Sequence, residues 1–258
     1  MEGPWLEADV EGIGWWSPAA PDWPSAAALL EAGAAWPGHG THKAAATVLA
    51  PNERRRAPEP VRIACEAAAQ ACAAAGRAAS GLPSVFTSMH GDLAITDAMC
   101  AALANDPATL SPTKFHNSVH NAPAGYWTMA TGCHEASTSI SAWQGSFAAG
   151  LLEALVQCRA EARATLLVAY DIAGSGALGA ALPHSTACGF ALVVAPPATA
   201  ARGAKRLRIR HVADDTPAPQ APTAVVLQPV LQALATGTPA HLRLADGTGS
   251  ALELELCA

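Results

Sequence analysis

Two histidines, His116 and His120, lie four residues apart, a spacing that could support metal chemistry. On a helix this spacing would place both imidazoles on one face, where they could bind a metal ion. They lie between Pro112 and Pro123, however, among β-branched and turn residues that favour a loop. No third ligand suggests itself. We therefore interpret them as hydrogen-bonded loop histidines and expect no metal site.

A cysteine beside a histidine, Cys133 and His134, could supply a thiolate nucleophile. An activating histidine normally comes from elsewhere in the fold, so a structural thiol is the favoured interpretation. The seven cysteines are odd in number and scattered, with no C-x-x-C pair, which favours reduced thiols over disulfides or a zinc site. This pattern is typical of a cytoplasmic protein.

Two further motifs could bind anions. Residues 174–179, GSGALG, match the G-x-G-x-x-G turn that cradles phosphates, and they follow an apolar run. Pro183 stands where the next helix should continue, and no acidic residue about 20 residues on could hold a ribose. We therefore favour a small-residue loop and expect no cofactor. The run ERRR at 53–56 fits a phosphorylated or acidic partner and a solvated loop equally well.

Strand-like and helix-like segments alternate along the chain, which predicts an α/β fold. Apolar or alternating runs predict strands at 8–14, 84–91, 137–143, 163–172, 188–195 and 207–213, of which 163–172 is a central buried strand. Helix formers with stop signals predict helices at 25–33, 61–76, 92–106, 145–162 and 225–237. Residues 51–60 and 111–121 are expected as loops, and 240–256 as a hairpin that turns at Asp246-Gly247.

The chain has 258 residues, of which 51% are hydrophobic and only 14% are charged, with a formal net charge of −6. This hydrophobicity excludes a disordered chain, and the mildly acidic balance without a basic stripe argues against nucleic-acid binding. No stretch approaches the roughly 18 apolar residues of a membrane span. A typical soluble domain is about 25% charged. The low charge therefore predicts apolar surface that a partner covers.

Five segments, taken in order, resemble the N-terminal half of β-ketoacyl-acyl carrier protein (ACP) synthases. They are GIGWWSP, LSPTKFHNSVHNAPAGYWTMATG, TSISAWQGSFAAGLLEAL, RATLLVAYDIAGS and CGFALVVAPPATAARGAKRLRIRHV. The resemblance covers roughly residues 8–212, and the ordered set is specific although each motif alone is weak. It implies an α/β, thiolase-like fold with a ketoacyl-synthase N-terminal-like domain at 1–212. Residues 213–258 would then form a short C-terminal extension, a helix and a hairpin, that packs on this domain.

Active synthases of this family carry a cysteine between a strand and a helix, because a helix N-terminus stabilises a thiolate. Counting from Ala124-Gly125 carries that position onto Gln144. An amide cannot form a thioester, and Cys133 lies eleven positions too early. Gln at this position resembles chain length factors, the inactive partners of polyketide ketosynthases, and also loading-type decarboxylating ketosynthase domains.

The second half of the synthase fold, which carries a catalytic histidine pair or its equivalent, has no counterpart here. Only about 45 residues follow Val212, without a recognisable Gly-Thr-x-Thr or His-Gly motif. This short form resembles the chain-length-factor-like proteins of aryl polyene biosynthesis. In that family the loop after the Ser-Pro reaches across the dimer and lines the partner's acyl pocket. The acyl-tunnel or partner-interface residues that this loop implicates are Thr113, Lys114, Phe115, His116 and His120. Tyr126 and Gln144 would lie near the partner interface or the vestigial site.

Three hypotheses follow. The first is a non-catalytic subunit that forms a heterodimer with a full-length β-ketoacyl-ACP synthase, shapes its acyl or polyene tunnel, and meets the acyl carrier protein only indirectly. The second is a malonyl-carrier decarboxylase that uses Gln144, against which the missing histidine pair weighs. The third is a scaffold module without a ketosynthase partner. The first fits the low charge best, because it supplies a cover for apolar surface.

Overall fold

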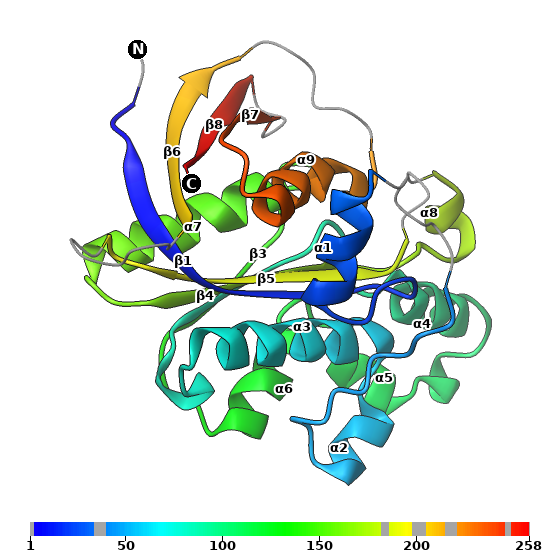
Figure 1. The fold of residues 1–258 in the computed structure, drawn as a ribbon. Coiled ribbons are helices and arrows are strands. Elements are labelled where there is room, and N and C mark those ends of the chain that lie inside the picture. Colours follow the sequence, from blue (N-terminus) through cyan, green and yellow to red (C-terminus); the bar gives the residue numbers. More distant parts are fainter. Residues whose placement is uncertain are drawn as a thin grey trace.

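A sheet of eight strands runs through the molecule in the order β3-β2-β4-β5-β1-β6-β8-β7 (Figure 1). The computed structural model describes residues 3–33, 40–181, 186–197, 205–214, 221–245 and 249–257, without the side chains of Leu178 and Ala181. The strands are β1 (Leu6–Trp16), β2 (Ser84–Thr87), β3 (Ser137–Ile140), β4 (Thr165–Asp171), β5 (Cys188–Ala195), β6 (Lys205–Ala213), β7 (Ala240–Ala245) and β8 (Ser250–Cys257). β2 pairs in parallel with β3 and β4, and the other neighbouring strands pair antiparallel.

β4 and β5 form the buried centre of the sheet. Every residue of both strands is buried. Their sequences, TLLVAYD and CGFALVVA, are nearly continuous apolar runs, as a strand covered on both faces requires. The strands predicted at 163–172 and 188–195 are therefore confirmed, and so is the mixed α/β fold.

Helices cover both faces of this sheet (Figure 1). On one face, α3 (Glu59–Ala75) packs against β1, β5 and β4, with α6 (Ala122–Thr131) beside it. On the other face, α7 (Ser146–Ala160) packs against β4, β1 and β2, and α1 (Trp23–Glu31) packs against α9 (Thr223–Thr236). The buried side chains accordingly form two clusters, one on each face of the sheet.

The remaining helices surround these layers. They are α2 (Pro51–Arg56), α4 (Leu93–Asn105), α5 (Pro112–Asn117) and α8 (Gly176–Ala181), with 3-10 turns at Ala79–Gly81 and Pro107–Thr109. Within the described ranges, no helix is long and apolar enough to cross a membrane.

The end of the chain extends the same sheet. β6 pairs with β8, and β8 pairs with β7, both antiparallel. This confirms the hairpin predicted at 240–256, although its turn, Asp246-Gly247, lies outside the described residues. The division of the chain into a domain at 1–212 and an extension at 213–258 stays a prediction.

Two segments predicted as loops contain short helices, and these predictions were wrong. α2 lies within 51–60, and α5 lies within 111–121. Each begins with a proline, Pro51 or Pro112, at the first helical position. A proline there lacks only an N–H that the helix does not use, and its fixed φ favours the helical turn. These prolines therefore start helices rather than bracket loops.

The glycine motif at 174–179 was also expected to be a loop. That expectation was wrong for residues 176–179, because α8 begins at Gly176. α8 has only six residues, so it is a short helix that tertiary packing must support. It contacts α4 on the rim of the sheet.

Two glycines of β1 let α3 lie directly against the sheet. A Cβ atom at Gly12 would lie 2.2 Å from the carbonyl oxygen of Ala71, and one at Gly14 would lie 2.0 Å from that of Ala67. Both distances are far shorter than any contact between a carbon and an oxygen atom that are not bonded to each other. Only glycine therefore fits at these two positions. The facing residues of α3 are alanines, whose small side chains allow the same close approach.

Gly14→Ala should lower the free energy of unfolding by about 3 kcal/mol, because the added methyl group forces α3 away from β1. Gly125→Ala in α6 is the matched control, since nothing lies within 4 Å of its Cβ position. Alanine favours a helix over glycine, so this variant should gain about 0.5–1 kcal/mol. Urea unfolding followed by circular dichroism measures both values. Equal stability of the two variants would contradict this account of the packing.

Candidate functional site

A tight turn between β3 and α7 presents Gln144. The preceding residue, Trp143, has a positive φ of 53°, which is uncommon for a bulky side chain. The Ser146 hydroxyl accepts a hydrogen bond from the Ala142 amide at 2.9 Å and donates one to the Trp143 carbonyl oxygen at 2.5 Å. Gly145 caps α7. Gln144 thus lies between a strand and a helix, directly before the helix N-terminus.

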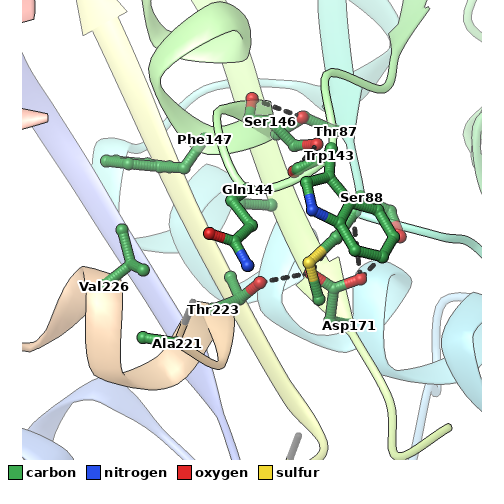
Figure 2. A pocket seen from close by; sticks show the side chains of 12 residues that line it. Thr87, Ser88, Trp143, Gln144, Ser146, Phe147, Asp171, Ala221, Thr223 and Val226 are labelled. Carbon is green, nitrogen blue, oxygen red and sulfur yellow. Dashed lines mark hydrogen bonds between the residues drawn. The ribbon is translucent and has the colours of Figure 1, made fainter. Parts of the chain in front are cut away.

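A small pocket adjoins this turn, as Figure 2 shows. The ends of β2 and β4, the turn itself and the start of α9 line it with Thr87, Ser88, Met89, Trp143, Gln144, Ser146, Phe147, Ala169, Asp171, Ala221, Thr223 and Val226. In Figure 2 the Gln144 amide is directed towards Thr223. The Gln144 Nε2 atom is buried, and it finds no hydrogen-bond acceptor in the described part of the chain. A buried N–H without an acceptor is rare because it costs free energy, so this position favours a ligand oxygen.

Asp171, the last residue of β4, is the buried acid of this pocket. Its carboxylate accepts hydrogen bonds from the Ser88 hydroxyl at 2.8 Å, from the Met89 amide at 3.0 Å and from the Thr223 hydroxyl. Burial raises the pKa of the Asp171 carboxyl above its usual value, and the hydrogen bonds and the nearby His90 oppose that rise. The carboxylate therefore joins the end of β2, the end of β4 and the start of α9.

A larger cavity of about 430 Å³ adjoins the first pocket. It lies between α9 and β7 and is lined mainly by apolar residues, Ala221, Val225, Val226, Pro229, Leu242, Leu244 and Ala245. Arg243 and Asp214, paired at 3.8 Å, add charge to its wall. Gln144 lines both hollows. Its amide is thus one of the polar groups that a chain occupying the larger cavity would meet.

The other residues predicted for the tunnel or partner interface lie apart from this pocket. Thr113, Lys114, Phe115 and His116 are exposed together on α5, and the Phe115 side chain is 65% exposed. None of these four lines the pocket of Gln144. The structure therefore separates the exposed helix α5 from the turn that carries Gln144.

His120 and Tyr126 lie between these two groups. The His120 Nε2 atom is 3.4 Å from the carbonyl oxygen of Ser88, which lines the pocket. Tyr126 is buried and donates a hydrogen bond to Asn117 Oδ1 at 3.1 Å, and burial raises the pKa of its hydroxyl. The Tyr126 ring also meets the His116 ring edge to face, with centroids 6.4 Å apart. These contacts hold α5 against the body of the protein.

The histidine and cysteine pairs take the positions of structural residues. α5 ends at Asn117, so His116 and His120 do not share a helix. Cys133 is buried, and its thiol donates a hydrogen bond to the Leu82 carbonyl oxygen at 3.4 Å. Over the described ranges, no group of three potential metal ligands converges.

Asp171, Ser88 and Thr223 were not predicted as site residues. Asp171 ends β4 and Ser88 follows β2, and these strands are parallel neighbours. The carboxyl ends of adjacent parallel strands meet at one edge of the sheet, so polar residues at both ends were a usable signal. Thr223 lies 52 residues beyond Asp171. No local pattern connects those two.

The sequence matches the family described as "Beta-ketoacyl synthase, N-terminal domain" over residues 23–243. The chain belongs to this family, as the ordered motifs predicted. The comparison with curated proteins gave no match.

Solved ketosynthase structures have the same fold. The ketosynthase ApeO in complex with its chain length factor ApeC, from Xenorhabdus doucetiae, matches with a TM-score of 0.77 at 22% identity, over 96% of this chain and 99% of that chain. The ishigamide ketosynthase/chain length factor matches with a TM-score of 0.74 at 14% identity, over 97% and 99%. The AntDE:AntF complex, a type II PKS acyl-carrier protein with its ketosynthase, gives 0.75 at 13% identity, over 100% of both chains. The predicted thiolase-like fold is therefore confirmed.

Asp171→Asn should change how stability depends on pH. The pKa of the Asp171 carboxyl is higher in the folded state than in the unfolded state. Its contribution to stability is therefore fully present below the unfolded pKa and is lost as pH rises through the folded pKa. The asparagine keeps an oxygen that can accept from the Met89 amide and carries no charge. The stability of the variant relative to wild type should therefore increase as pH rises from about 4 to 7.

Denaturant unfolding at several pH values measures this difference. A difference that is independent of pH would contradict the raised pKa of Asp171. Asp171→Ala is the control, because it removes the acceptor for all three donors. We expect it to be less stable than Asp171→Asn at every pH.

Proposed function

We propose that this protein is a non-catalytic subunit, similar to a chain length factor, that pairs with a full-length β-ketoacyl-ACP synthase. It would shape the tunnel that holds the growing acyl chain during fatty-acid or polyketide-type synthesis, with an aryl polyene as the product class. The observation that carries the proposal is Gln144 at the start of α7, where the family resemblance places a nucleophilic cysteine.

The chemistry of this position supports a non-catalytic role. A helix N-terminus lowers the pKa of a thiol and stabilises the thiolate. A carboxamide gains nothing from that field, because it does not ionise near neutral pH and cannot form a thioester. The described lining of the pocket also includes no cysteine and no histidine. Acyl transfer there would lack both the cysteine nucleophile and the histidine base of the family's active members, so the proposal assigns condensation to the partner.

An edge strand and nearby apolar side chains support a protein partner. β3 is the terminal strand of the sheet order, so its outer backbone groups face no described strand. Met129 on α6, which contacts β3, is 65% exposed, and Trp143, just after β3, is 50% exposed. Exposed aromatic and methionine side chains are enriched in interfaces. These features fit strand pairing with a second subunit.

The solved structures add support from their subunits. Two of them contain a ketosynthase with its chain length factor, and this chain covers 99% of the aligned chain in each. A chain of this length therefore accounts for nearly all of a subunit that folds in the same way. The low charge of 14% is in line with a subunit that buries apolar surface in a complex.

Decarboxylation of a malonyl group on a carrier protein is a second candidate function. The buried Gln144 Nε2 without an acceptor favours it. As the bond between the methylene carbon and the carboxylate breaks and CO2 leaves, the electron pair forms an enolate, whose oxygen such a donor would stabilise. A proton from water then gives the acetyl thioester. The absence of histidine from the described pocket lining weighs against this function.

Substitutions on α5 should change product length in the complex with the ketosynthase. If Phe115 lines the partner's acyl pocket, Phe115→Ala should lengthen the product by about one extension cycle and Phe115→Trp should shorten it, because pocket volume limits the chain. His116→Ala should act in the same direction as Phe115→Ala. Mass spectrometry of the released chains measures the distribution.

Val156→Ala is the matched control, because Val156 is an exposed apolar residue on α7, 42% exposed, away from α5. It should leave product length unchanged. Identical products from all four variants would exclude a role of α5 in the tunnel.

Loss of CO2 from malonyl-ACP tests the second function. If Gln144 stabilises the enolate, Gln144→Ala should slow decarboxylation about 100-fold. Gln157→Ala, which removes an amide from the far end of the same helix, should have no effect. Release of CO2 by the chain alone and with its ketosynthase gives the rates. A wild-type chain without turnover in both settings would remove this function and leave the non-catalytic proposal intact.

A further inference from the structure

A second large hollow lies on the α3 face of the sheet, away from Gln144. Its volume is about 570 Å³. Its lining combines the end of β1, the segment before α2 and the first turns of α3, with Trp16, Pro18, Gly40, Thr41, His42, Lys43, Ala44, Glu59, Arg62 and Ile63. Trp16 and Ile63 belong to the α3-side cluster, whereas Phe147 of the Gln144 pocket belongs to the opposite cluster. The sheet therefore separates the two hollows.

Positive charge dominates the wall of this hollow. Lys43 and Arg62 line it with two cationic side chains, and His42 lies beside Lys43. Glu59 is the single carboxylate of the described lining. It forms no ion pair with Arg62, although it lies one turn before it on α3. The cations of this wall are thus left for a ligand to neutralise.

Two buried donors of the same wall have no acceptor. The Trp16 Nε1 and Arg62 Nε atoms are both buried, and neither makes a hydrogen bond to any described residue. Trp16 is only 3% exposed. Both groups can only donate hydrogen bonds. A buried N–H of either kind costs free energy while it has no acceptor.

The wall opposite α3 is held in place by its backbone. The His42 amide donates a hydrogen bond to the Pro18 carbonyl oxygen at 3.1 Å, and the Ala46 amide donates one to Glu66 Oε2 on α3 at 2.6 Å. Gly40 packs so closely that a Cβ atom would lie 1.9 Å from the Pro18 oxygen. The segment that carries His42 and Lys43 is therefore fixed at both ends, and the site is preformed.

We propose that this hollow binds an organic phosphate. Arg62 offers a planar fork of donors and Lys43 a point charge, which is a combination suited to a phosphoryl group. The half-buried Pro18 and Ala44 supply apolar surface for the organic part of the ligand. The site is independent of the function proposed for Gln144, because it lies on the other face of the sheet.

Isothermal titration calorimetry of the purified chain, or of its complex, tests the site with two probes at constant ionic strength. Inorganic phosphate should bind saturably with a dissociation constant on the order of 1 mM. Phenyl phosphate should bind more tightly because its ring packs on this apolar surface. Arg62→Gln should weaken both about tenfold, and Lys43→Gln should weaken both to a smaller extent.

Arg159→Gln is the matched control, since Arg159 is an exposed cation at the end of α7. It should leave both affinities unchanged. No saturable binding, or an equal loss in Arg159→Gln and Arg62→Gln, would overturn the site, because the heat would then report general charge attraction. Equal affinity for the two probes would overturn the organic part of the proposal. Circular dichroism of each variant confirms that a loss of binding is not a loss of fold.

Discussion

The carboxylate of Asp171 holds together the segments that frame Gln144. It accepts hydrogen bonds from Ser88 and Met89 after β2 and from Thr223 at the start of α9. The Met89 carbonyl oxygen in turn accepts from the Ser141 hydroxyl at 3.0 Å, at the entrance to the turn that carries Gln144. A buried carboxylate is stable only with such donors. The pocket, the turn and the C-terminal helix therefore depend on one acid.

The site that these contacts build fits the proposed non-catalytic function, because Gln144 lies where the family resemblance places the reactive cysteine. The N-terminus of α7, which would stabilise a thiolate, is preceded by the amide side chain of Gln144. What remains is a rigid scaffold with an apolar cavity between α9 and β7, an exposed α5 and an edge strand β3. A structure of this kind is suited to shaping a neighbour's tunnel. The proposed complex would also account for the low charge, since it would cover surface that one chain leaves apolar.

Most of the fold could be predicted from local sequence. The buried runs of β4 and β5 and the alanine-rich α3, with its terminal Gly76, follow from burial and helix propensity. The short helices α2 and α5 were missed because a proline at a helix start looks like a loop boundary. The position of Gln144 followed from the family resemblance and not from any local pattern.

The contacts of both hollows could not be predicted in this way. Thr223 meets Asp171 across 52 residues, and Trp16, Lys43 and Arg62 come together only because β1 lies under α3. Such contacts depend on tertiary packing, and no local sequence pattern indicates them.

Hydrogen exchange of the chain with and without its ketosynthase tests the central claim most directly. The described sheet has two terminal strands, β3 and β7. If β3 pairs with the partner, its amides and those of α5 should gain protection in the complex while β7 stays unchanged. Protection confined to β7, or no change in either strand, would contradict the account.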